Sequence, residues 1–141
     1  MSTACHVVST CLYGLVGVVS LVMALKSLGA RTFLPFHEAA SGRSWPAIDD
    51  RLQAVILALL RASGLGFLGV GLQLVLVSVG SWLDRNLVVA LALPLVSLVF
   101  CVGLSVLNYD LHRRTHARTP WRGSVYAAVA LAVALALSIA S

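Results

Sequence analysis

Four long apolar stretches are the feature that most constrains how this chain can fold. They cover residues 7–25, 62–83, 87–107 and 125–140, and most reach the ~20 residues that a helix needs to cross a bilayer. The chain is 60% hydrophobic and only 11% charged, against roughly 25% charged residues in soluble domains. A chain of 141 residues has too much surface to hide this excess in a core. The sequence therefore predicts an all-α protein, a single-domain bundle of four transmembrane helices.

The second apolar stretch begins well before residue 62, and Arg61 interrupts it. In one interpretation, residues 33–60 form an interfacial segment with a short amphipathic helix over 47–60, and Arg61 lies at the headgroup level before the crossing. In the other, one long tilted helix carries Arg61 into the membrane. We favour the first, because an Arg near the bilayer midplane costs at least ~2.5 kcal/mol.

Basic residues are distributed unequally between the two sides of the predicted bundle. The second loop contains only Arg85. The first and third loops and their flanks contain eight cations: Lys26, Arg31, Arg43, Arg51, Arg113, Arg114, Arg118 and Arg122. Cytoplasmic loops carry such an excess, so we expect both termini on the non-cytoplasmic side. We expect the basic residues behind the net charge of +5 to interact with lipid headgroups at the membrane surface. No nucleic-acid partner is expected.

A histidine beside a carboxylate stands in the middle of the first loop. His37 and Glu38 are a candidate proton-transfer pair, and Arg61 is a candidate for stabilising developing negative charge. Glu38 and Asp110 are the candidate partners for Arg61, and the alternative is that Arg61 extends to the lipid headgroups without a partner. The metalloprotease pattern H-E-x-x-H is excluded, because Ser41 replaces its second histidine. The alternative is that these groups are simply solvated at the membrane surface.

A polar stripe follows one face of the third span. Its members are three or four residues apart: Ser97, Cys101, Ser105, Asn108 and His112. In lipid this face should turn inward, either to pack against another helix or to line a polar pocket that opens to the cytoplasm. The candidate ligand-binding residues are Ser105, Asn108, Asp110, His112 and Trp45.

Glycines at positions 64, 66, 69 and 71 include a match to the pattern G-x-G-x-x-G, at 64, 66 and 69, but they lie inside an apolar helix and not between a strand and a helix. Close helix packing explains them, and Gly14 and Gly17 of the first span offer a matching thin surface. His112 and His116 are four apart, and two ligands alone make a weak metal site. No metal or cofactor is therefore predicted.

Three segments carry a resemblance to a known group. LPFHEAASGRSW follows the first span, RLQAVILALLR begins the second apolar stretch, and RTHARTPW precedes the last span. In these the chain resembles uncharacterised small bacterial four-span membrane proteins that share a Pro-aromatic-His segment and a Thr-Pro-Trp segment. The resemblance implies the inner membrane of a bacterium. It implies no activity and no functional residues.

Three functions from different classes follow from these features. In the first, a cytoplasm-facing polar pocket binds a lipid or a lipophilic small molecule without chemistry. In the second, the same residues form an acid–base enzyme, such as an isomerase, cyclase or hydrolase, for a lipid or isoprenoid-like substrate. In the third, the glycine-rich faces dock a second copy or a partner in a larger membrane complex.

Overall fold

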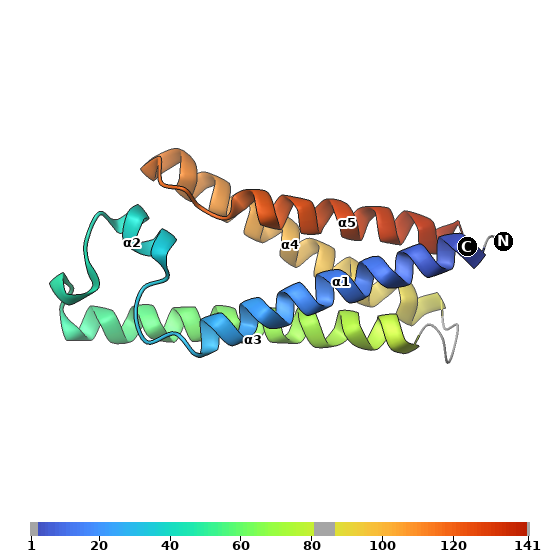
Figure 1. The fold of residues 1–141 in the computed structure, drawn as a ribbon, viewed down its shortest axis with the longest axis horizontal. Helices are drawn as coiled ribbons and strands as arrows, with labels where there is room; N and C mark the ends of the chain where they lie inside the picture. The colour runs from blue at the N-terminus through green and yellow to red at the C-terminus, as the bar shows by residue number, and fades with distance from the viewer. Residues whose placement is uncertain (1–2, 81–86, 141) are drawn as a thin grey trace.

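The computed structural model describes residues 3–80 and 87–140, and it is a helical bundle (Figure 1). Its elements are α1 (Thr3–Leu28), α2 (Pro35–Ser41), the 3₁₀ helix η1 (Trp45–Ala47), α3 (Asp50–Gly80), α4 (Leu87–Thr115) and α5 (Trp121–Ile139). Four of these helices are long and apolar enough to cross a membrane. The predicted all-α bundle with four transmembrane helices is therefore confirmed, and the chain is a multi-pass membrane protein.

The four long helices form two hairpins that pack against each other. The most extensive contact is between α1 and α3, followed by α4 with α5 and α1 with α5, while α3 and α4 touch less. Both termini lie at one end of the bundle, and α2 lies at the other, beside the start of α3 (Figure 1). We call the latter the α2 end; it also contains the loop between α4 and α5.

Glycine allows α1 and α3 to approach almost to backbone contact. A Cβ atom added at Gly17 would lie 3.1 Å from the backbone nitrogen of Val75, and one at Gly71 would lie 3.0 Å from that of Leu21. Transmembrane helices associate through such small residues, because lipid gives no hydrophobic drive for their contact. The predicted packing role is confirmed for Gly17 and Gly71, whereas a Cβ atom added at Gly69 would meet nothing within 4 Å. The same faces are used within the chain, so they are not free to dock a partner.

Polar side chains join α1 to α3, α1 to α5 and α3 to α4. The Ser78 hydroxyl of α3 donates to the Thr10 carbonyl of α1 at 3.0 Å. The Tyr13 hydroxyl of α1 lies 3.1 Å from Ser138 Oγ of α5. The Gln73 amide of α3 donates to the Leu93 carbonyl of α4 at 2.9 Å, and also to a serine hydroxyl one turn further along α4. Such hydrogen bonds add to helix association where no water competes.

The structure corrects the expected division of the second apolar stretch. Residues 50–80 form one continuous helix, α3, with no break at Arg61. No proline interrupts this segment, and Arg itself favours helix. At 1.5 Å per residue, Arg61 lies about 29 Å along the axis from Gly80, which is close to the ~30 Å thickness of the hydrocarbon core. A continuous helix can therefore still place Arg61 at the headgroup level.

The other helices extend beyond the predicted spans. α1 begins four residues earlier than the span predicted at 7–25, and α5 begins at Trp121 and not at residue 125. α4 continues eight residues past the predicted end at Leu107, to Thr115. The expected end of the second span at Leu83, and Arg85, lie outside the described residues.

Candidate functional site

A cavity of about 480 Å³ opens at the α2 end of the bundle. Its walls come from the first loop, α3 and α4, and its lining residues are Phe33, His37, Ala40, Ser41, Ile56, Leu59, Leu60, Ser63 and Leu111. We call it the apolar cavity. Its volume is within the range of ~300–1,000 Å³ that is typical of small-molecule sites.

Short-range signals fix the helix that forms one wall. Pro35 begins α2, where its missing N–H is no loss. Gly42 ends the helix with φ of 64°, a left-handed conformation that suits glycine, and its N–H donates to the Glu38 carbonyl at 3.1 Å. The Ser41 hydroxyl donates to the same carbonyl at 3.1 Å. This short helix is thus closed at both ends by the residue types that its sequence provides.

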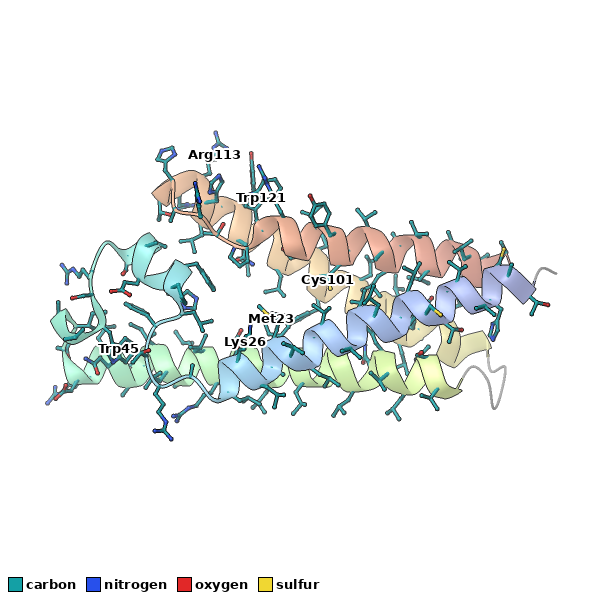
Figure 2. All side chains as sticks on the ribbon, viewed as in Figure 1. Met23, Lys26, Trp45, Cys101, Arg113 and Trp121 are labelled. Atoms are coloured by element: carbon teal, nitrogen blue, oxygen red, sulfur yellow. The ribbon has the colours of Figure 1, made fainter. Side chains whose placement is uncertain are left out.

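Aromatic rings connect α2 to the start of α3. The His37 ring lies 4.0 Å from the Phe36 ring and 6.2 Å from the Phe33 ring, measured between centroids. Phe33 in turn meets Trp45 edge to face at 5.0 Å. The Gln53 amide of α3 donates to the Trp45 carbonyl at 3.1 Å, and Figure 2 shows Trp45 beside the first turns of α3. Trp45 therefore supports the loop and does not line the cavity.

His37 is the one titratable side chain that lines the apolar cavity. Burial lowers the pKa of His37 from its ordinary value of 6.5, because a charged imidazolium is poorly solvated there. At neutral pH the ring is neutral, with one N–H donor and one acceptor nitrogen. Its Nδ1 atom is buried and makes no hydrogen bond to any described residue. A buried polar atom without a partner is costly.

The other two candidate catalytic residues lie elsewhere. Glu38 and Arg61 are exposed, and neither lines the apolar cavity. The candidate pairing of Arg61 with Glu38 or Asp110 is wrong for the described residues, because the ion pair found there joins Asp110 to Arg114 at 2.8 Å, one turn apart on the surface of α4. Local i, i+4 geometry favours that pair over a distant one.

The polar stripe of α4 divides into two parts. Ser97 and Cys101 are buried in the bundle, and the Gln73 amide donates to the Ser97 hydroxyl. The Ser105 hydroxyl donates to the Cys101 carbonyl of its own helix at 2.8 Å. This half of the stripe faces the interior of the bundle and packs α4 against α3, which is the first of the two roles expected for it. It does not line the apolar cavity.

The second half of the stripe closes the loop between α4 and α5. His116 ends α4 with φ of 54°, and its N–H donates to the His112 carbonyl at 2.8 Å, as in a left-handed helix cap. The His112 Nδ1 donates to the Ala117 carbonyl at 2.6 Å, and the Thr119 hydroxyl donates to the Asn108 carbonyl at 2.9 Å. His112 and Asn108 therefore position a loop, and neither lines the apolar cavity.

Sequence reasoning missed the residues that α3 contributes to the cavity. They are Ile56, Leu59, Leu60 and Ser63, and their spacing is that of a single helix face. That spacing could have marked the face, but only with α3 read as one helix through Arg61. Leu111 was missed as well, because the third span was predicted to end at Leu107.

Comparison with protein-family models, curated proteins and solved structures gives no match for this chain. Its function is therefore inferred from the cavity and the groups that line it.

Proposed function

We propose that the protein binds an uncharged lipid or lipophilic molecule with a hydroxyl or carbonyl head in the apolar cavity. The observation that carries this proposal is a lining without Asp, Glu, Lys or Arg, in which the buried His37 Nδ1 has no partner among the described residues. A phosphate or carboxylate would lose its hydration there without gaining a countercharge, which is expensive. A hydroxyl or carbonyl would lose far less and would gain hydrogen bonds.

Two groups are suited to hold such a head. The His37 ring offers a donor and an acceptor nitrogen, and the hydroxyl of Ser63, an exposed residue that lines the cavity, can both donate and accept. The hydroxyl of Ser41, the third polar residue in the lining, already donates to backbone carbonyls. The remaining lining is aliphatic or aromatic and suits a hydrocarbon chain.

The position of the cavity relative to the bilayer supports an amphiphilic ligand. With Gly80 at one edge of the hydrocarbon core, Arg61 reaches the other edge, and its neighbours Leu60 and Ser63 lie at the same depth. The polar head of a membrane-dissolved molecule would be held at the headgroup level, with its chain directed into the bilayer.

An acid–base enzyme is the weaker alternative. It needs a second catalytic group near His37, and Glu38 and Arg61 do not line the cavity with it. The hypothesis of an accessory subunit required free glycine faces on α1 and α3, and these faces pack against each other within the chain. Binding without chemistry requires neither a second catalytic group near His37 nor a free glycine face.

The proposed location is the inner membrane of a bacterium, with the α2 end in the cytoplasm and both termini outside. The described cations gather at the α2 end, as the positive-inside rule requires of a cytoplasmic side. Fusion of alkaline phosphatase to the C-terminus should give an active enzyme in a bacterial host, and fusion of green fluorescent protein should stay dark. A fluorescent fusion would show that the C-terminus is cytoplasmic and that the proposed orientation is wrong.

Two adjacent alanines of α2 allow a matched test of ligand binding. Ala40 lines the apolar cavity, whereas Ala39 does not. The full chain in nanodiscs is irradiated with a diazirine-bearing hexadecanol, or with the matching diazirine-bearing palmitic acid as a charged probe. We expect the alcohol to label residues 56–63 more than the acid does, and Ala40→Phe to abolish this labelling while Ala39→Phe keeps it. Equal labelling of both variants, or preference for the acid, would refute the proposal.

A further inference from the structure

A second cavity, of about 460 Å³, lies on the other side of α2. It is lined by Pro35, Phe36, Ala39, Arg118, Thr119 and Pro120, and we call it the basic cavity. The residues of α2 that line it are on the helix face opposite to His37, Ala40 and Ser41, which line the apolar cavity. The short helix α2 thus separates two sites of different chemistry.

The loop that carries Arg118 is held in place on both sides of that residue. The preceding residue, Ala117, is buried, and its carbonyl accepts from His112 Nδ1 at 2.6 Å. The following residue, Thr119, donates through its hydroxyl to the Asn108 carbonyl at 2.9 Å. Both anchors belong to α4, so the backbone of Arg118 is fixed relative to the bundle. A pre-positioned cation loses less freedom on binding an anion.

The positive charge at this site is not neutralised within the described part of the chain. No carboxylate lines the basic cavity, and the ion pair at this end joins Arg114 to Asp110. Arg118 is exposed and makes no ion pair with a described residue. Arg113 in the last turn of α4 and Arg122 in the first turn of α5 also have no such partner. Figure 2 shows Arg113 and Trp121 together at this end of the α4–α5 hairpin.

The remaining lining of the basic cavity is apolar. Pro35, Phe36, Ala39 and Pro120 offer hydrocarbon surface, and Trp121 directly follows at the start of α5. Tryptophan is enriched at the level of the lipid headgroups. A free phosphate ion would gain nothing from these apolar residues, whereas the glycerol and upper acyl chain of a lipid would contact them.

We propose that the basic cavity binds the phosphate of an anionic phospholipid from the leaflet at the α2 end. The Arg118 guanidinium donates to the phosphate oxygens, with a geometry for which arginine is well suited, and Phe36 and Pro35 contact the glycerol region. This site is separate from the apolar cavity and does not depend on the function proposed for it.

The test measures unfolding of the full chain in dodecyl maltoside with added dioleoylphosphatidylglycerol. We expect this lipid to raise the unfolding temperature of the unchanged protein, with dioleoylphosphatidylcholine much less effective. Arg118→Gln should raise the half-saturating lipid concentration about tenfold, the loss expected for a charge-assisted hydrogen bond. Arg43→Gln is the matched control, since Arg43 is an exposed cation of the first loop that lines neither cavity.

Further arms separate a built site from general charge attraction. Inorganic phosphate at the same concentration should have no effect; if it reproduces the stabilisation, the site takes a free anion and the lipid assignment is wrong. Equal losses in Arg43→Gln and Arg118→Gln would also overturn the proposal. Ala39→Phe fills the basic cavity without changing charge and should lose the lipid effect, whereas Ala40→Phe should retain it. If Ala39→Phe keeps the stabilisation by the lipid, the lipid does not bind in the basic cavity. This conclusion would not depend on the labelling of the apolar cavity by the alcohol probe.

Discussion

The contact between α1 and α3 predicts that the same substitution has different effects on stability at two glycines of one helix. A Cβ atom added at Gly71 would lie 2.7 Å from Leu21 Cδ2 and 3.0 Å from the Leu21 backbone nitrogen. The leucine side chain can turn away, but the backbone can move only if the two helices separate. A Cβ atom at Gly69, two residues away, would meet nothing within 4 Å.

The magnitude follows from two terms. Replacing glycine by alanine inside a helix is favourable by up to about 1 kcal/mol, and this term is common to both variants. Overpacking of a close contact costs typically about 1–3 kcal/mol, and it applies only to Gly71→Ala. We therefore expect Gly69→Ala to be neutral or stabilising, and Gly71→Ala to be less stable than Gly69→Ala by about 1–3 kcal/mol.

The free energy of unfolding is measured for both variants by titrating mixed micelles of dodecyl maltoside with dodecyl sulfate, followed by circular dichroism. Because both variants carry the same chemical change on the same helix, their difference isolates the contact with α1. If Gly71→Ala proves as stable as Gly69→Ala, α1 and α3 are not held at the separation described, and the account of how the bundle packs would have to be abandoned.

Three further predictions concern individual polar groups. Because burial lowers the pKa of His37 below 6.5, the unfolded chain binds more protons below that pH, so the free energy of unfolding should fall as the pH is lowered from 6.5 toward the lowered pKa. His37→Phe should flatten this dependence in a pH series; an unchanged slope in His37→Phe would contradict the burial of this ring. Gln73→Leu removes the hydrogen bonds between α3 and α4 and should cost about 1–2 kcal/mol, and Ser97→Ala should add little to it in a double-mutant cycle; additive losses would show that the pair does not interact. His112→Phe leaves a loop carbonyl without its donor and should cost about 1–3 kcal/mol, with faster amide exchange in residues 117–119; unchanged exchange would mean that this histidine does not hold the loop.

The long apolar helices were predictable because hydrophobic length alone selects a membrane span. The break expected at Arg61 was wrong for a physical reason. The cost of burying an arginine constrains the depth of the residue and not the continuity of the helix. A helix longer than the bilayer satisfies both conditions, and α3 with 31 residues is such a helix.

The candidate site was predictable only in part. His37 was singled out from its sequence neighbours, and it lines a cavity. Its partners depend on how α2 packs between α3 and α4, which a pattern along one helix does not contain. The role of His112 depends on the left-handed conformation of His116, which few residues other than glycine adopt, and nothing in the local sequence signals it. Arg61 does not pair with Asp110, because Asp110 forms its ion pair with Arg114, one turn away on α4.

The pairing of helices has a consequence for how the chain is assembled during synthesis. The two most extensive contacts, α1 with α3 and α4 with α5, each join spans that are consecutive in the sequence. Each hairpin can therefore form once its second span has been synthesised, because its contacts join spans that follow each other along the chain. Docking of the two hairpins on each other, through α1 with α5 and α3 with α4, then remains as the later step.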